Sequence, residues 1–373
     1  MAGLYLHIPF CKQACYYCDF HFSTDSRHRS ELLEAMHKEM TLRKGFLSAP
    51  LETIYFGGGT PSLLEGDQIA SFLALAEKTF GIAPQPEITL EANPDDLTKD
   101  KLHAIRAAGV NRLSIGIQSF RDDLLKYLHR AHDAQAARRS LEESREAGFT
   151  NISIDLIYAI PGLDLASWET SLKEAASYRP EHLSSYSLTI EERTVFGHHL
   201  RAGKLRRVED EQAAQQFERM QDVLEDLGYE QYEISNFSLP GFHSRHNSSY
   251  WLQKPYLGIG PSAHSYDGVR RYVNLANNPR YAEALRSDRI PSEAEVLSAV
   301  DQINEYLLTR LRTKWGVDLR VLRKLGDDLP GRCGSRLNRY MEEGLLVISG
   351  EEVRLTRRGM LLADRITEEL MAG

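Results

Sequence analysis

Hydrophobic and polar positions alternate between strand-like and helix-like spacing from the N-terminus to about residue 240. Short apolar runs predict strands at 4–8, 53–56, 87–91, 112–116, 151–157 and 182–188. Amphipathic stretches between them predict helices at 30–43, 67–79, 98–108, 134–147 and 165–177, the first of them capped by Ser30. Such alternation predicts an α/β fold with a parallel sheet and crossover helices.

Residues that could bind a ligand or take part in catalysis lie at or near the carboxyl ends of these strands. Three cysteines follow the first strand and a Gly-Gly-Gly segment at 57–59 follows the second. Glu91 ends the third strand, Gln118 follows the fourth and Asp155 lies within the fifth. An α/β barrel, whole or partial, places an active site on one such rim. A doubly wound sheet also places loops there and is the alternative.

The last eighty residues have a different pattern. Helices are predicted at 296–313, 319–325 and 335–343, followed by a β-hairpin at 345–355, which together outline a small winged-helix-like α+β domain. Residues 291–373 hold 13 Lys and Arg against 14 Asp and Glu. A DNA-binding domain should be basic, so interdomain packing or protein contact is the favoured role. We predict domains at 1–240 and 291–373, joined by a connecting segment at 241–290.

Composition excludes several classes of protein. The 373 residues carry 45 Lys and Arg against 53 Asp and Glu, a net charge of −8, which argues against nucleic acid as the main partner. No apolar run is long enough to cross a membrane, and the first residues lack the pattern of a signal peptide. A cytoplasmic location is therefore predicted.

Cysteine spacing is the most informative local signal. Cys11, Cys15 and Cys18 lie within eight residues, whereas Cys333 is far along the chain and is predicted to be a packing residue or a free thiol. Three thiolates this close can hold three corners of a cubane iron–sulfur cluster and leave one iron open. The alternative is a zinc site completed by His7 or His21.

The segment YLHIPFCKQACYYCDF at 5–20 resembles the signature of the radical S-adenosylmethionine (SAM) superfamily. Within it, the whole chain is similar to the anaerobic coproporphyrinogen III oxidase family, which includes the haem chaperone (HemW) subfamily. The resemblance implies a partial (β/α)6-type barrel, a [4Fe–4S] cluster held by the three cysteines, and SAM at the open iron.

The resemblance also implies roles for individual residues. Gly58, Gly59 and Thr60 match a glycine-rich turn that approaches the amino-acid part of SAM. Tyr5 and Tyr17 match positions near SAM, and Glu91 matches a carboxylate that binds its amino group or ribose. Further matches are polar residues that line the oxidase cavity and hold a second SAM there: Gln118, Arg130 and Asp155.

Three features favour the chaperone subfamily over the oxidases. Phe20 stands where the oxidases have a fourth cysteine, and ten residues precede Cys11 where they have an extension. The segment HNSSYW at 246–251 resembles the HNxxYW motif of the chaperones, and imidazole is a common ligand of haem iron. His246 is thus the predicted haem contact, with His243 and His264 as candidates for a second ligand.

The resemblance therefore implies a protein that binds haem and passes it to haem proteins such as respiratory-chain subunits. Peripheral membrane association and a homodimer are compatible with that role. An oxygen-independent coproporphyrinogen III dehydrogenase, which decarboxylates propionate side chains oxidatively, is the alternative. A zinc-bearing regulator that uses the C-terminal domain is a third hypothesis.

Overall fold

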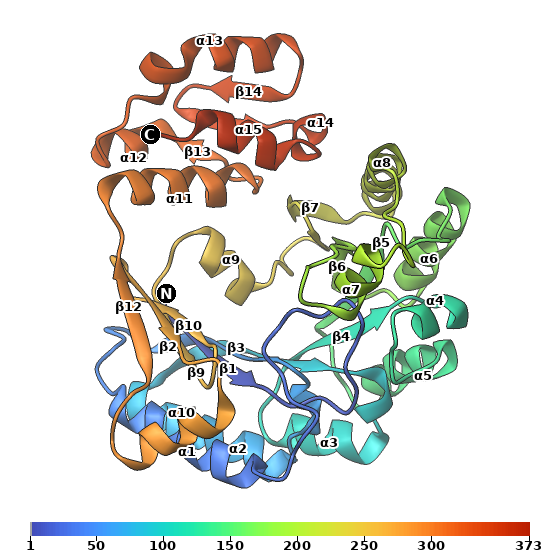
Figure 1. Ribbon diagram of the computed structural model, residues 1–373, viewed down its shortest axis with the longest axis vertical. Coiled ribbons are helices and arrows are strands. Elements are labelled where there is room, and N and C mark those ends of the chain that lie inside the picture. The colour runs from blue at the N-terminus through green and yellow to red at the C-terminus, as the bar shows by residue number, and fades with distance from the viewer. Residues whose placement is uncertain (1) are drawn as a thin grey trace.

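One curved sheet organises most of the chain, and the computed structural model describes residues 2–373 (Figure 1). Within these residues the sheet has twelve strands in the order β12-β11-β10-β9-β1-β2-β3-β4-β5-β6-β8-β7. Its six central strands run parallel, and they are β1 (Ala2–Ile8), β2 (Leu51–Gly58), β3 (Ile82–Ala92), β4 (Arg112–Gln118), β5 (Ile152–Tyr158) and β6 (His182–Ser187). This sequential order lacks the reversal of a doubly wound sheet, so the partial barrel is confirmed.

Crossover helices cover the outside of the parallel strands. They are α1 (Arg29–Leu42), α2 (Gly66–Phe80), α3 (Lys99–Ala107), α4 (Asp122–Tyr127), α5 (Ala134–Glu146) and α6 (Leu165–Ser177), with short 3₁₀ turns at η1 (Pro61–Leu63) and η2 (Pro94–Asp96). Side-chain caps start several of them, such as Asp133 on α5 and Asp164 on α6. The predicted cap at Ser30 is wrong, because α1 begins one residue earlier after His28 and has no side-chain cap.

Strand register brings the predicted polar residues to one face of the sheet. Glu91 on β3 lies opposite Ser114 on β4, and Asp155 on β5 lies opposite Ser184 on β6. Because side chains alternate between faces, residues paired this way point to the same side. The opposite face packs Leu, Ile and Phe against the helices in one large core. The concave side of the barrel therefore carries polar side chains, whereas the outer side, which the helices cover, is hydrophobic.

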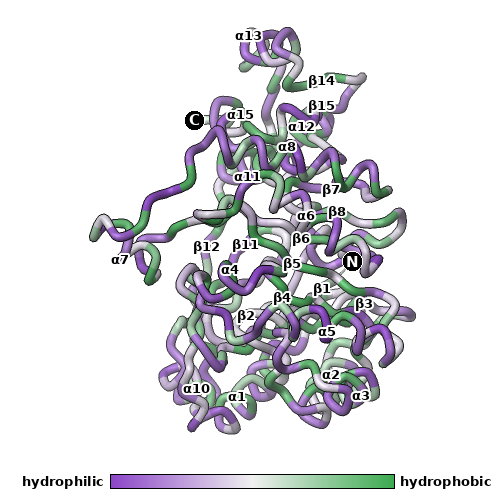
Figure 2. Tube along the Cα trace, turned by 90° about the vertical axis from the view of Figure 1, so that its right-hand side faces the viewer, coloured by the Kyte–Doolittle hydropathy of each residue, from purple (hydrophilic) through white to green (hydrophobic). Residues whose placement is uncertain are grey.

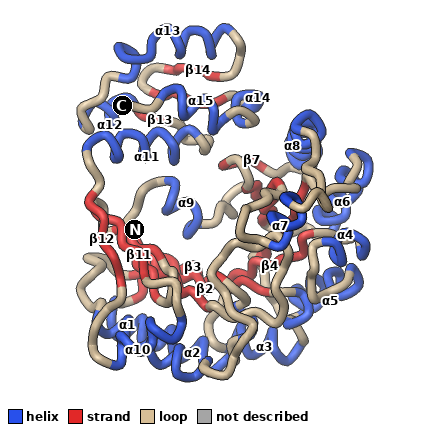
Figure 3. The backbone as a smooth tube through the Cα atoms, viewed as in Figure 1, coloured by secondary structure: helices blue, strands red, loops and turns tan. Residues whose placement is uncertain are grey.

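Further strands extend the sheet at both edges and leave it open, and all their pairings are antiparallel except that of β9 with β1. β7 (Glu230–Glu233) and β8 (Asn236–Ser238) follow β6, after helices α7 (Val195–Arg201) and α8 (Asp210–Asp226). The other edge carries β9 (Tyr256–Ile259), β10 (His264–Tyr266), β11 (Arg270–Asn274) and β12 (Ser292–Val296), with helices α9 (Arg245–Trp251) and α10 (Asn278–Arg286). Figure 3 shows this second extension as a group of strands below the C-terminal helices.

The C-terminal residues form a second, separate hydrophobic core. Its elements are α11 (Ala299–Leu311), β13 (Val317–Asp318), α12 (Leu319–Lys324), α13 (Leu329–Glu342), β14 (Leu346–Ser349), β15 (Glu352–Leu355), α14 (Arg357–Met360) and α15 (Ala363–Leu370). The β14–β15 hairpin turns where the sequence predicts, and Cys333 is a buried packing residue of this core. The winged-helix-like outline is confirmed.

Figure 2 colours each residue by hydropathy, and hydrophobic residues alternate with polar ones along β4 and β5. Among residues 2–373, no helix combines the length and apolar character needed to span a bilayer.

Candidate functional site

The three cysteines lie on one loop that leaves the carboxyl end of β1. A bridge between Phe10 and Ser23 closes the base of this loop, with Cys11 N–H donating to the Ser23 carbonyl at 3.0 Å. In Figure 1 the dark blue loop crosses the open side of the barrel toward β4 and α7. Its residues are therefore placed over the carboxyl ends of the parallel strands.

The segment 128–130, after β4 and α4, holds the cysteine loop in place. Tyr16 N–H donates to the Leu128 carbonyl at 3.2 Å, and the Tyr16 ring stacks on His129 at 4.3 Å between centroids. Gln13 donates its side-chain amide to the His129 carbonyl at 2.9 Å. A loop that would otherwise be mobile thus gains fixed contacts on both sides of Cys15.

Arg130 connects the cysteine loop with the strand ends. Its guanidinium donates to Cys15 Sγ at 3.4 Å and to the Tyr17 hydroxyl at 3.3 Å. It also donates to Asn93 Oδ1 at 2.7 Å and to the Gly116 carbonyl at 2.9 Å. Arg130 therefore acts as a charged clamp that lies beside one of the predicted cluster ligands.

A cavity of about 560 Å³ opens between the loop and the strand ends; we call it the cluster cavity. Its wall includes most of the residues that the sequence nominates, from several strands and loops: Cys11, Cys15, Tyr17, Cys18, Gly58, Gly59, Thr60, Glu91, Gln118, Arg130 and Asp155. Two nominated residues, Tyr5 and His246, do not line it. The volume is in the range of small-molecule sites.

The glycine-rich end of β2 is tightly packed. A Cβ on Gly59 would lie 2.8 Å from the Phe10 carbonyl oxygen, and one on Gly58 would lie 2.7 Å from the His7 ring. Gly58 also has a φ of 109°, which side chains disfavour. Its N–H donates to Glu91 Oε2 at 3.1 Å. The glycines are thus required by contacts within the protein, and Gly57 and Gly58 belong to β2 instead of the predicted turn.

Two carboxyl groups line the cluster cavity. Glu91 accepts from the Tyr55 hydroxyl at 2.8 Å, and burial raises the pKa of its carboxyl to about 7. Asp155 accepts from the Ser114 hydroxyl at 3.2 Å, and burial also raises the pKa of Asp155. Both groups suit a cationic or hydroxyl-bearing ligand, because such a partner stabilises the ionised carboxylate.

The donor set in the cluster cavity fits an iron–sulfur cluster. All three cysteines are free thiols, and burial raises the pKa of Cys11 and raises that of Cys18 to about 11. Metal centres bind the thiolate form, so assembly of a cluster here would release the protons that burial keeps on these thiols. The cysteines would hold the cluster, which supplies an electron donor, and Arg130 would contact the sulfur of Cys15.

The zinc alternative does not fit this geometry. His7 Nε2 is 2.9 Å from the His21 carbonyl, and His21 Nε2 is 2.7 Å from Asn278 Oδ1. Both imidazoles face away from the cluster cavity and line another one. Within residues 2–373, no three His, Cys, Asp or Glu side chains are arranged to hold a single metal ion.

His246 occupies an enclosed position between α9 and the barrel. Its Nδ1 is 2.8 Å from Thr53 Oγ1 and its Nε2 is 2.8 Å from the Tyr250 hydroxyl. The ring stacks on Tyr55 at 4.9 Å and is only 1% exposed, and burial lowers its pKa to about 3. Ligation of haem iron by His246 stays a prediction, and this geometry does not favour it.

A second cavity, of about 550 Å³, lies beside the first; we call it the side cavity. Its wall comes from β1, the cysteine loop, α9, β9 to β11 and α11: Tyr5, His7, Asp19, Phe20, His21, Tyr250, Trp251, Gln253, Lys254, Tyr256, Ser262, His264, Tyr266, Arg271, Glu305 and Thr309. Asp19 and Phe20 line both cavities and so form a shared wall. His243, the other candidate ligand, lies outside both cavities and contacts Glu230 at 3.0 Å.

Sequence reasoning missed several residues of the cluster cavity. Tyr55 donates to Glu91 and Ser114 donates to Asp155. Both fit the ordinary inward and outward alternation of side chains along β2 and β4, so nothing in the sequence distinguishes them from structural residues. Asn247, in the HNSSYW segment, reaches the cluster cavity although its neighbour His246 does not. His129 does not line the cavity but supports the cysteine loop, and its stacking on Tyr16 links residues 113 positions apart in sequence.

Comparison with known proteins agrees with this arrangement. Residues 5–175 match the radical SAM superfamily and residues 297–362 match the HemN C-terminal domain. Haem chaperone HemW of Bacillus subtilis is 38% identical over 98% of both chains, and that of Escherichia coli is 31% identical over 99% of this chain and 98% of its own. The structure of coproporphyrinogen III oxidase (HemN) from Escherichia coli has a TM-score of 0.85 at 24% identity, covering 100% of this chain and 90% of its own.

The fold and the cysteine loop over the strand ends define a radical SAM domain followed by a HemN-type C-terminal domain. The likeness to the solved oxidase extends over both cores and concerns the fold. The sequence relatives, matched along nearly their full length, are more specific, and the chain belongs to the HemW family.

Proposed function

We propose that this protein is a haem chaperone: it binds haem and delivers it to recipient haem proteins, such as respiratory-chain subunits. Besides haem, the protein holds two cofactors. One is a [4Fe–4S] cluster bound by Cys11, Cys15 and Cys18, and the other is SAM in the cluster cavity. The observation that carries the proposal is the side cavity, which adjoins the cluster cavity and shares Asp19 and Phe20 with it. One protein thus offers separate spaces for a cofactor pair and for a cargo.

The wall of the side cavity suits a planar, mostly apolar cargo with carboxylate edges. Tyr250 and Tyr256 pack edge to face at 4.6 Å, and Trp251 continues this aromatic surface. Flat aromatic surfaces bury a large area of a macrocycle at low entropic cost. Names of the sequence relatives, which are haem chaperones, agree with this chemistry.

The test is haem transfer by the cluster-loaded protein. Protein reconstituted without oxygen should bind hemin with a shifted Soret band and about one haem per chain. Mixing with an apo haem protein should move the Soret band to that of the acceptor, faster than free hemin alone under the same conditions. Binding without transfer, or no binding at all, would contradict the chaperone function.

A turnover assay separates this function from that of the oxidases. Incubation with dithionite, SAM and coproporphyrinogen III without oxygen should leave the substrate unchanged, whereas a dehydrogenase would produce protoporphyrin after oxidation. Phe20, at the position of the additional cysteine in the oxidases, is consistent with the absence of that reaction.

A further inference from the structure

One histidine of the side cavity, His264, has an imidazole without hydrogen bonds to the rest of the described chain. His264 begins β10 and is exposed, and neither of its ring nitrogens has a hydrogen-bond partner among residues 2–373. His7 and His246 use both ring nitrogens, and the contacts of His7 are with the Tyr5 hydroxyl and the His21 carbonyl. His21 uses one ring nitrogen, which contacts the Asn278 side chain. Burial first and the Arg271 cation second lower the pKa of His264.

The side cavity also carries a cation without an ion-pair partner. Lys254 follows α9, is exposed, and has no carboxylate partner within the described chain. The other cation on this wall, Arg271, is already paired with Glu305 of α11 at 2.9 Å. A ligand carboxylate would therefore meet Lys254 as a free counter-charge.

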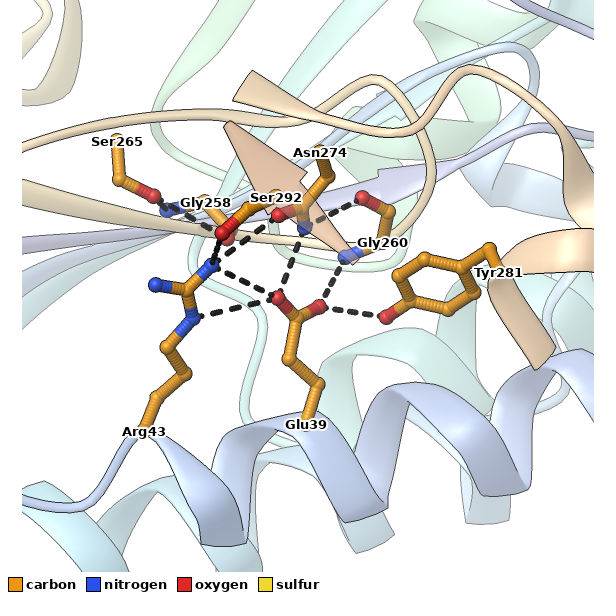
Figure 4. A network of polar contacts seen from close by, with 8 residues as sticks. All are labelled: Glu39, Arg43, Gly258, Gly260, Ser265, Asn274, Tyr281 and Ser292. Atoms are coloured by element: carbon orange, nitrogen blue, oxygen red, sulfur yellow. Dashed lines mark hydrogen bonds and ion pairs between the residues drawn. The ribbon is translucent and has the colours of Figure 1, made fainter. Parts of the chain in front are cut away.

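A buried network fixes the turn that presents His264 (Figure 4). Glu39 of α1 is fully buried, and its carboxylate accepts from Gly260 N–H at 3.0 Å and from Asn274 Nδ2 at 2.8 Å. Asn274 Nδ2 also donates to the Gly260 carbonyl at 2.9 Å. The turn between β9 and β10 is therefore held from both sides, four residues before His264. An imidazole on a rigid turn is suited to hold a metal in one geometry.

Phe20 lies on the cysteine loop and also lines the side cavity. It is 73% exposed, so it offers a free aromatic face. Because Asp19 and Phe20 line both cavities, a planar ligand in the side cavity would lie against the same loop that carries the three cysteines.

We propose that haem occupies the side cavity with His264 as its iron ligand, Lys254 facing a propionate, and Phe20 covering the macrocycle on the side of the cluster loop. This assignment rests on the proposed chaperone function and moves the ligand away from His246 of the HNSSYW segment. His246 instead positions α9, whose Tyr250 and Trp251 form the aromatic wall.

The test compares hemin titrations of cluster-loaded wild type, His264→Ala, His246→Gln and His21→Ala, recorded as difference spectra. His264→Ala should weaken hemin binding by about tenfold or more and shift the Soret maximum, and added imidazole should restore that maximum. His21→Ala, which removes another imidazole of the same cavity, is the matched control and should stay within about threefold of wild type.

Outcomes of this titration separate the two proposals. Wild-type protein that binds hemin while His264→Ala keeps the same Soret maximum and affinity would overturn the ligand assignment and leave the chaperone function intact. A loss of the ligand signature in His246→Gln alone, with His264→Ala unaffected, would overturn it in the same way. No binding by wild type would overturn both proposals.

A second variant tests the propionate contact independently of iron ligation. Lys254→Met should weaken hemin binding by about threefold to tenfold and leave binding of haem dimethyl ester, whose propionates are uncharged, unchanged. Equal effects on hemin and its ester would contradict the placement of Lys254.

Discussion

The two cavities of this protein are similar in size and share a wall, but they are built in different ways. Residues of the cluster cavity come mainly from the carboxyl ends of consecutive parallel strands and the loop after β1. Residues of the side cavity range from Tyr5 on β1 to Thr309 on α11. A site on a regular rim can be recognised from the order of elements, whereas a site between distant segments depends on how they pack.

The difference also extends to charge. In the cluster cavity, Arg130, Glu91 and Asp155 are held by neighbouring side chains before any ligand arrives. In the side cavity, His264 and Lys254 have no such partners among residues 2–373. Preorganised groups suit cofactors that stay bound, and open groups suit a cargo that must also leave.

Removing a cluster ligand should have the largest effect and should affect one cavity only. Cys15→Ser leaves two thiolates, so we expect the iron content to fall from about four per chain to near zero after anaerobic reconstitution. Cys333→Ser, in the C-terminal core, is the control and should assemble the cluster normally. Hemin affinity should change less than about threefold in both variants. A concurrent loss of hemin binding would show that the cavities are not independent.

Removing the buried network should affect the other cavity. Glu39→Ala leaves the Arg43 guanidinium buried without its carboxylate, which costs about 3–5 kcal/mol of unfolding free energy. It also frees the turn before His264, so hemin affinity should fall while iron content per folded chain stays constant.

Glu31→Ala is the control for that variant, because it removes a partly exposed, ion-paired carboxylate from the same helix, with an expected cost below about 1 kcal/mol. Urea unfolding and hemin titration provide the measurements. A Glu39→Ala protein as stable as Glu31→Ala would refute the importance of the network.

The pH dependence of stability should reveal His246. Its folded-state pKa of about 3 lies below the ordinary 6.5, so the unfolded chain takes up the proton first as pH falls. Unfolding free energy should therefore decrease below about pH 6.5, by about 2 kcal/mol at pH 5 from this residue alone.

His246→Gln should lack this part of the pH dependence, while the exposed His103→Gln should retain it. Urea unfolding at pH 7 and pH 5 measures both. An unchanged difference between the two pH values in His246→Gln would contradict the enclosed, neutral state of the ring.

SAM binding should respond to Glu91 with a smaller effect. Because the pKa of Glu91 is about 7, the carboxylate that would contact SAM becomes protonated between pH 8 and pH 6. We expect SAM affinity to decrease about tenfold over that range, measured by equilibrium dialysis. Glu91→Gln should bind weakly at both values and show a flat profile. A wild-type profile that is equally flat would exclude the contact.

Most of the fold was predictable because it rests on local patterns. All six parallel strands and the five predicted helices between them appear near the predicted positions, since buried strands and amphipathic helices have different hydrophobic periods. The short helix α4 was not predicted. Ends were less accurate: β3 begins at Ile82 instead of residue 87, and α1 has no cap at Ser30. Those details depend on pairing with neighbouring strands and on the preceding loop, which periodicity does not describe.

What the sequence alone determined is the cluster cavity, because a compact cysteine motif and residues at strand ends lie together whenever parallel strands form. What only the tertiary structure decided is the state of the side chains far apart in sequence. Packing of α9 against the barrel enclosed His246, and the turn held by Glu39 left His264 open. The exposure and hydrogen bonding of an imidazole depend on its neighbours in space, and a sequence motif does not specify those neighbours.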